Sequence, residues 1–179
     1  MPKSKKPKFH AGHATIIGLP NAGKSTLLNA IVGEKIAIVT AKAQTTRTSL
    51  TGVWTGDNAQ IVFVDTPGVH KSDTVINRRM MQVVRASLNA VDVVVYVVDA
   101  TRRPGEEDAQ TVDLVKKPGT PIILVLNKVD QIKDKPKILA LIEHFKALHD
   151  FNEYIPLSAK SGDGIDDLRK TIAKYLPES

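Results

Sequence analysis

The sequence contains no cysteine, which excludes a disulfide framework and any chemistry that depends on a thiolate. It also contains no apolar run close to the roughly 20 residues that a membrane-spanning helix needs. The longest candidate, residues 93–98, is bounded by Asp92 and Asp99. The histidines do not lie at the spacing of zinc ligands. These absences exclude a membrane-spanning chain and a cysteine-based metal site.

The N-terminus is basic, but the apolar segment of a secretory signal does not follow it. We therefore expect a cytoplasmic protein, with peripheral attachment to the inner face of the cell membrane as the alternative. Lys3, Lys5, Lys6 and Lys8 contribute much of the net charge of +6. Such a segment suits either an anionic partner or a solvated tail, and we expect residues 1–10 to form a disordered tail.

The remaining composition is that of an ordinary globular protein, with 42% hydrophobic and 25% charged residues among 179. This length favours a single domain, which we place at residues 11–179. Apolar runs alternate with segments of helical period, a pattern typical of a mostly parallel sheet with helices on both faces. The predicted strands are 13–17, 49–55, 60–64, 92–98, 121–126 and 154–157, and the predicted helices are 24–32, 75–89, 106–116, 136–148 and 165–176. A turn signal at 55–58 predicts that the second and third strands are antiparallel.

A phosphate-binding loop is predicted after the first strand, where the sequence fits G-x-x-x-x-G-K-[ST]. Its residues are Gly18, Leu19, Pro20, Asn21, Ala22, Gly23, Lys24 and Ser25, and Thr26 follows in the helix. Glycines let the backbone wrap around a phosphate, while amides and the helix N-terminus supply a positive field. Lys24 is expected to reach the terminal phosphates, and the Ser25 hydroxyl to bind magnesium. The sequence therefore predicts a P-loop fold, a three-layer α/β sandwich that binds a nucleoside triphosphate.

A second motif, D-x-x-G, follows the predicted strand 60–64, at the end of the sheet where open α/β folds bind ligands. It consists of Asp65, Thr66, Pro67 and Gly68. Asp65 is expected to hold magnesium through water, and the Gly68 amide to bond the γ-phosphate. The alternative is a simple turn after an edge of the sheet.

The string Asn127, Lys128, Val129, Asp130 indicates which base is bound. A carboxylate at Asp130 can accept hydrogen bonds from N1–H and the exocyclic amine of guanine together, a donor pair that adenine lacks on that edge. Asn127 is expected to brace the loop and meet acceptors of the base, and the Lys128 stem to cover its face. After the last strand, the backbone amides of Ser158, Ala159 and Lys160 are expected to donate to the guanine carbonyl. The predicted ligands are therefore GTP and GDP.

In order and spacing, these motifs resemble the translation-factor-related P-loop GTPases of the TrmE-Era-EngA-like family, over about residues 13–176. Within that family, the phosphate loop and the string Ala43, Gln44, Thr45, Thr46, Arg47 are similar to the G domain of the Era proteins. The resemblance implies that Thr46 is the switch threonine, with Thr45 as the alternative. Thr46 would complete a magnesium site with Ser25 and Asp65, and act in catalysis with Gly68 and Lys24.

The same resemblance implies a role in assembly of the small ribosomal subunit, with 16S rRNA as a partner. Era-like proteins contact this RNA through a C-terminal KH-type domain. The sequence has no GXXG string of that domain, so we expect the KH domain to be absent from this chain. We expect weak RNA binding at most, and a monomer.

The hydrolytic step lacks one usual side chain, because Val69 occupies the position where many GTPases place a water-orienting glutamine. The adjacent His70 is more readily explained as a solvent-facing loop residue than as a base. Relatives with asparagine at the Asn21 position bind potassium beside the phosphates, so we expect potassium to accelerate hydrolysis. Two other functions remain open: a GTP-dependent binding module with negligible hydrolysis, and an ATPase or nucleotide kinase.

Overall fold

The computed structural model describes residues 7–33, 50–65, 78–116 and 119–179. Its strands are β1 (His10–Ile17), β2 (Leu50–Thr55), β3 (Ala59–Val64), β4 (Val93–Asp99), β5 (Ile122–Asn127) and β6 (Glu153–Pro156). Its helices are α1 (Lys24–Val32), α2 (Arg78–Asn89), α3 (Glu106–Val115), α4 (Lys135–Leu148) and α5 (Ile165–Lys174), with a short 3-10 helix η1 (Val129–Gln131). Every predicted strand and helix is confirmed, with bounds that differ by a few residues.

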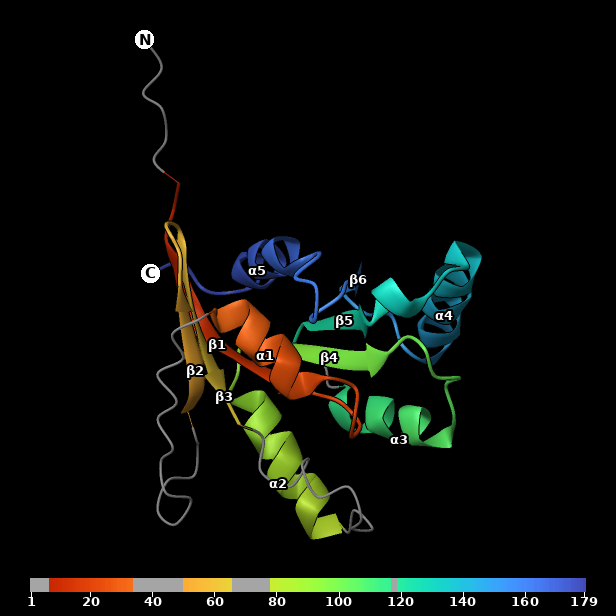
Figure 1. The fold of residues 1–179 in the computed structure, drawn as a ribbon. Helices are drawn as coiled ribbons and strands as arrows, with labels where there is room; N and C mark the ends of the chain where they lie inside the picture. Colours follow the sequence, from red (N-terminus) through yellow and green to blue (C-terminus); the bar gives the residue numbers. More distant parts are fainter. Residues whose placement is uncertain (1–6, 34–49, 66–77, 117–118) are drawn as a thin grey trace.

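The strands form one sheet in the order β2-β3-β1-β4-β5-β6. Only β2 is antiparallel to its neighbour, with Thr55 opposite Gln60, and the turn between β2 and β3 is closed by a 2.8 Å bond from the Gly56 amide to the Ala59 carbonyl. The predicted hairpin is thus confirmed. Because the other strands are parallel, the carboxyl ends of β1, β3, β4, β5 and β6 all lie at one edge of the sheet (Figure 1).

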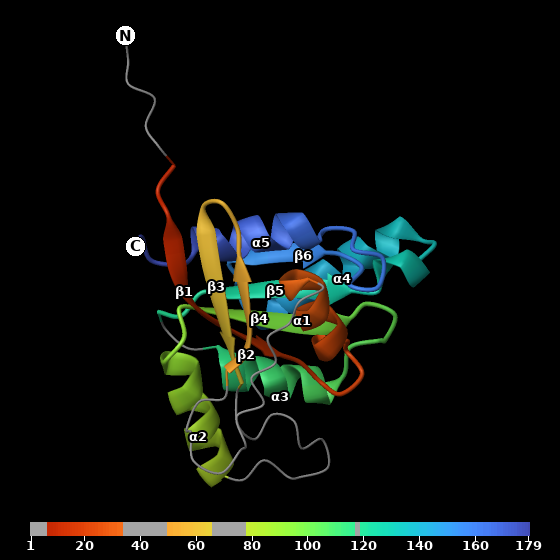
Figure 2. The same ribbon diagram turned by 60° about the vertical axis from the view of Figure 1, so that its left-hand side comes forward.

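Helices cover both faces of the sheet, as Figures 1 and 2 show. On one face, Val95 of β4 shares a buried cluster with Leu27 of α1 and Leu168 of α5. On the other face, the neighbouring Tyr96 shares a buried cluster with residues of α2, α3 and α4, and its ring centroid lies 6.2 Å from that of Phe145. Successive side chains of the central strand β4 thus lie in two apolar cores, one on each face of the sheet, which confirms the three-layer α/β sandwich.

The predicted boundary of the N-terminal tail needs correction. Strand β1 begins at His10, which we had placed in the tail. The Phe9 carbonyl accepts a 2.8 Å hydrogen bond from the Ser179 amide, and Lys8 lies 3.3 Å from Glu178. Residues 8–10 are therefore paired with the C-terminal residues, and residues 1–6 lie outside the described part. Among the helices that the structure describes, none has the length and apolar character needed to cross a bilayer.

Candidate nucleotide-binding site

The phosphate loop joins β1 to α1 at the edge where the parallel strands end (Figure 1). Gly18 is buried, and a Cβ atom there would lie 2.5 Å from the Val97 carbonyl oxygen. Gly23 has a φ of +96°, and a Cβ atom there would lie 2.4 Å from Nδ2 of Asn127. No side chain can be added at either position without moving its neighbours. Both glycines of the motif are therefore required by the packing of this loop.

A positive electrostatic field is built into the start of α1. Lys24 is the first residue of the helix, and no acidic residue lies in its first turn. Burial lowers the pKa of the Lys24 ammonium, and the negative charge of Asp65 opposes that shift. Ser25 and Thr26 follow as exposed hydroxyls. A lysine, two hydroxyls and the positive end of a helix dipole together form a surface suited to phosphate.

Two of the three predicted magnesium ligands lie in the described part of the chain. Ser25 is exposed at the start of α1, and Asp65 directly follows β3. Hydroxyl and carboxylate oxygens are ligands that magnesium prefers, and the ion usually keeps several waters, so these residues fit it. Within the described ranges, no group of three or more histidine, aspartate or glutamate side chains is placed to hold a metal by itself.

Several predicted residues lie outside the described residues, so their roles stay predictions. They are Thr46 of the switch segment, and Thr66, Pro67, Gly68, Val69 and His70 after Asp65.

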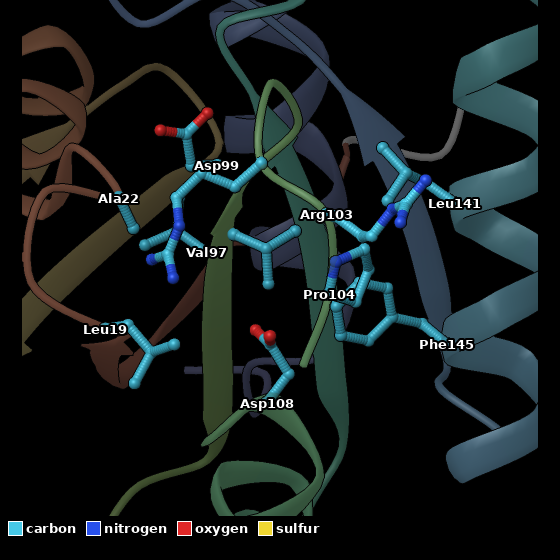
Figure 3. A pocket seen from close by; sticks show the side chains of 11 residues that line it. Leu19, Ala22, Val97, Asp99, Arg103, Pro104, Asp108, Leu141 and Phe145 are labelled. Carbon is cyan, nitrogen blue, oxygen red and sulfur yellow. The ribbon is translucent and has the colours of Figure 1, made fainter. Parts of the chain in front are cut away.

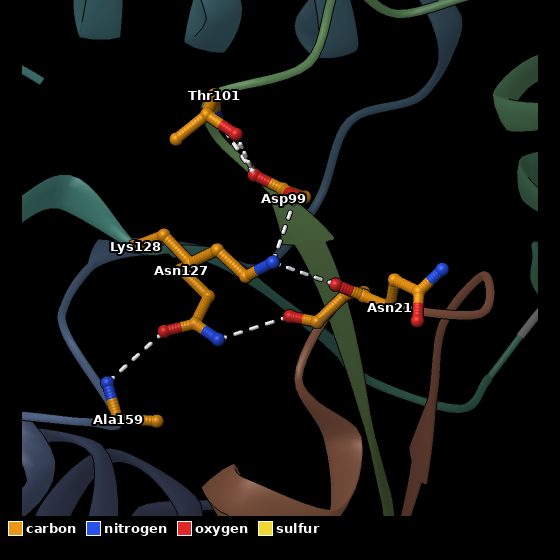
Figure 4. Close-up of polar contacts among 7 residues, drawn as sticks. Asn21, Asp99, Thr101, Asn127, Lys128 and Ala159 are labelled. Carbon is orange, nitrogen blue, oxygen red and sulfur yellow. Dashed lines mark hydrogen bonds and ion pairs between the residues drawn. The ribbon is translucent and has the colours of Figure 1, made fainter. Parts of the chain in front are cut away.

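Asn127, the last residue of β5, ties two loops together and has only 2% of its surface exposed. Its Nδ2 donates to the carbonyl of Ala22 in the phosphate loop at 2.9 Å. Its Oδ1 accepts from the amide of Ala159 at 3.0 Å (Figure 4). The prediction that Asn127 braces the loops is confirmed, and both polar groups of its side chain have protein partners.

Lys128 also reaches the phosphate loop, and it does so with a partner that the sequence analysis missed. Its ammonium donates to the Asn21 carbonyl at 2.8 Å and to Asp99 Oδ2 at 2.9 Å (Figure 4). The other carboxylate oxygen of Asp99 accepts bonds from the amide and the hydroxyl of Thr101. Although burial raises the pKa of Asp99, the bonds from Thr101 and Lys128 outweigh it and lower the pKa. The signal that could have identified Asp99 is an acidic residue at the carboxyl end of a central strand.

A cavity of about 190 Å³ lies beside these loops, where the sequence places the base. It is lined by Gly23, Thr26, Asn127, Lys128, Asp130, Gln131, Ser158 and Lys160. Asp130 lies in η1 and is exposed toward solvent. The two strings that predicted guanine binding, around Asp130 and Ser158, are thus brought together around one cavity with the phosphate loop.

The role predicted for the three amides after β6 stays a prediction, but two of these amides have partners within the protein. The Ser158 amide donates to the Asp163 carbonyl at 3.0 Å, and the Ala159 amide donates to Asn127. Of the three amides expected to face the base, only that of Lys160 has no hydrogen bond to another described residue. The Ser158 amide is bonded within the turn 158–164 and the Ala159 amide to a side chain of β5, which the tripeptide alone could not reveal.

A second, much smaller cavity of about 10 Å³ lies behind the phosphate loop. Figure 3 shows it between Leu19 and Ala22 on one side and Leu141 and Phe145 of α4 on the other. Its size is that of one water molecule, so it is a packing feature and not a ligand site.

Comparisons with known proteins agree with this geometry. Residues 13–128 match the protein family described as "50S ribosome-binding GTPase". GTPase Era of Trichlorobacter lovleyi is 46% identical over 170 residues, which cover 95% of this chain and 57% of the relative. GTPase Era of Coxiella burnetii is 44% identical over 175 residues, covering 97% and 58%. The chain therefore spans a little over half the length of these relatives.

Two solved structures illustrate the likeness in three dimensions. A crystal structure of Era in complex with MgGDPNP and nucleotides 1506–1542 of 16S ribosomal RNA is 40% identical, with a TM-score of 0.74, and the match covers 96% of this chain and 58% of that one. The G domain of the Thermotoga maritima FeoB iron transporter is 23% identical, with a TM-score of 0.65, covering 93% and 99%. The latter shows a shared fold alone.

Proposed function

The chain belongs to the family described as 50S ribosome-binding GTPases and matches the G domain of GTPase Era within it, and from this premise we propose that it binds GTP and hydrolyses it to GDP and phosphate. The observation that carries the proposal is that the phosphate loop, Asn127, Asp130 and Lys160 line the same cavity. Its residues supply a phosphate-binding helix terminus at one end and a carboxylate for guanine at the other.

In this proposal, each element has a separate task. Lys24 neutralises charge on the terminal phosphates, and Asp130 selects guanine. Ser25, Asp65 and Thr46 would hold magnesium, which would supply positive charge beside the phosphates. Gly68 bonds the γ-phosphate, so the segments that carry Thr46 and Gly68 present different surfaces in the two nucleotide states.

Guanine selection is tested by competition of GDP and ADP for one fluorescent guanine nucleotide. We expect GDP to displace it and ADP to fail. Replacing Asp130 by asparagine should weaken GDP binding and favour xanthosine diphosphate, because the exchanged donor and acceptor match that base. Asp134→Asn is the matched control, since Asp134 is exposed and its side chain makes no capping bond. Equal competition by ADP would contradict guanine selection and favour an ATPase or nucleotide kinase.

Hydrolysis needs a group that takes the place of the missing glutamine, and we propose potassium held by Asn21. The Asn21 side chain is exposed in the phosphate loop and makes no hydrogen bond to the residues that the structure describes. Single-turnover rates should be higher in potassium chloride than in sodium chloride at equal ionic strength. Equal rates would count against potassium. Absence of multiple-turnover phosphate release in both salts would favour a GTP-dependent binding module.

We propose a ribosomal role as well, in assembly of the small subunit. The support is the likeness to the Era complex with 16S ribosomal RNA, of which this chain spans 58%. The net charge of +6 favours a polyanionic partner. RNA binding by this chain should be weak and should fall steeply between two salt concentrations. Binding that does not respond to salt would argue against a phosphate-directed contact.

A further inference from the structure

One ammonium group joins three loops at the nucleotide site. Lys128 follows β5, and its Nζ lies between Asp99, at the end of β4, and Asn21, in the phosphate loop (Figure 4). The two distances are 2.9 and 2.8 Å, both within the range of charge-assisted hydrogen bonds. Neither acceptor is adjacent to Lys128 in the sequence, so the contact depends on the assembled edge of the sheet.

Asp99 is the fixed member of this group. Only 8% of its side chain is exposed, against 29% for Lys128. Thr101 holds Oδ1 with its amide and its hydroxyl, so that Oδ2 is directed toward Lys128. A carboxylate that is mostly buried, and whose two oxygens both accept hydrogen bonds, is held in one orientation. It therefore determines where the lysine ammonium can lie.

Asn21 has a left-handed backbone conformation. Its φ is +67°, and apart from Lys128 it is the only non-glycine with positive φ among the described residues. The left-handed region is unfavourable for a residue with a side chain, although asparagine tolerates it better than most residues. A hydrogen bond from an ammonium to the Asn21 carbonyl opposes that cost. In Figure 4 the Asn21 amide points away from Lys128, so the contact with the lysine is made by the backbone carbonyl of Asn21.

We infer that Asp99 is a positioning residue: it holds the Lys128 ammonium against the Asn21 carbonyl and thereby keeps this phosphate-loop residue in its left-handed conformation. The inference rests on the proposed function, because it assigns Asp99 to the nucleotide site. Loss of the charge at Asp99 releases Lys128, frees the Asn21 backbone and loosens the loop around the phosphates. GDP then dissociates faster, and the contribution of Asn21 to hydrolysis falls.

The test is a double-mutant cycle on the rate of release of a fluorescent GDP, with Asp99→Asn, Lys128→Met and the double variant of the whole chain. Asp99→Asn alone should release GDP roughly tenfold faster, the scale of one lost hydrogen bond to a charged group. In the Lys128→Met background the same change should add less than about twofold, because the residue acts through Lys128. Asp113→Asn removes another aspartate–lysine pair, to Lys116 on the exposed surface of α3, and should leave the rate unchanged.

Two results would overturn the inference. One is an equal rate of GDP release for Asp99→Asn and Asp113→Asn. The other is a double variant whose increase in rate equals the product of the increases in the Asp99→Asn and Lys128→Met variants. Should Asp99→Asn fail to fold, Thr101→Val weakens the same carboxylate. It should speed release about threefold, again only where Lys128 is present, and an unchanged rate overturns the inference. A chain that binds no GDP would contradict the proposed function, which separates that failure from this one.

Discussion

Asn127 contributes two side-chain hydrogen bonds to the site, and each one fixes a different loop against β5. Replacing it by alanine leaves the Ala22 carbonyl and the Ala159 amide without these partners in a buried position. We expect Asn127→Ala to reduce the free energy of unfolding by about 1–3 kcal/mol and to weaken GDP binding, because both the phosphate loop and the 158–160 turn lose their brace. Chemical unfolding and GDP titration measure the two effects.

Asn152 provides a matched control for Asn127. It also accepts a backbone hydrogen bond, at 2.9 Å from the Ile122 amide, but at the opposite end of β5. Asn152→Ala should therefore lower stability and leave GDP affinity unchanged. If both variants bound GDP equally well, the bracing role of Asn127 in nucleotide binding would be wrong.

Residue types alone predicted part of this site. Asn127 could be assigned because its string follows an apolar strand and its amide suits a brace between loops. The position of Asp99 at the end of a central strand could have placed it at the site, but its role could not be predicted, since that role depends on Lys128 and Thr101, whose side chains reach it only in the folded sheet. The protein partners of the Ser158 and Ala159 amides, Asp163 and Asn127, could not be predicted either, because they depend on how the following turn folds.

At the scale of elements, α1 is held at its C-terminus by a residue of α5. Helix α1 has no basic residue in its last turn. The Arg169 guanidinium supplies that charge, with bonds to the Ile31 carbonyl at 2.9 and 2.7 Å and to the Ala30 carbonyl at 3.0 Å. It also lies 5.2 Å from the ring centroid of Trp54 in β2. One side chain therefore joins α1, α5 and β2, and α1 carries the phosphate site at its other end.

Replacing Arg169 by glutamine should lower the free energy of unfolding by about 1–3 kcal/mol, because the two carbonyls lose a charged donor. The emission of Trp54 should also change in the folded state, and Trp54 is the only tryptophan of the chain. Urea unfolding followed by fluorescence and circular dichroism measures both. Lys174→Gln is the control, since the Lys174 side chain that pairs with Glu153 is exposed and its ion pair should contribute little to stability. Equal destabilisation by the two variants would refute the bracing role of Arg169.

The elements themselves were predictable where an apolar pattern sets them and less so at their ends. Strand β1 begins before its apolar residues, because His10 and Ala11 pair through their backbones with Ala59 and Gln60 of β3. Helix α5 ends at Lys174, although the apolar period continues to Leu176. Leu176 is buried beyond the helix end, with 4% of its surface exposed, so periodicity predicted its burial but not its conformation.

At the scale of the whole molecule, the site draws on five of the six strands of the described sheet. Its described residues come from the loops after β1, β3, β4, β5 and β6, which span the sheet from β3 to the edge strand β6. Lys24, Asp99 and Asp130 follow β1, β4 and β5, which are neighbours in the sheet although they lie far apart in the sequence. A nucleotide in this site contacts loops that separate on unfolding, so its binding free energy adds to the stability of the entire fold.

We therefore expect GDP with magnesium to raise the unfolding temperature of the chain as a single transition. At about 100 times its Kd, a ligand that binds only the folded state adds about 2.7 kcal/mol. For a chain of this length, that corresponds to a shift of roughly 5–10 °C. ADP should give no shift, and Asp130→Asn should transfer the shift from GDP to xanthosine diphosphate, because the base contact supplies the discrimination. Thermal scans at several nucleotide concentrations measure it. An equal shift of the unfolding temperature with ADP would mean that the phosphates alone account for binding. A shift confined to one part of the transition would mean that the sheet does not unfold as one unit.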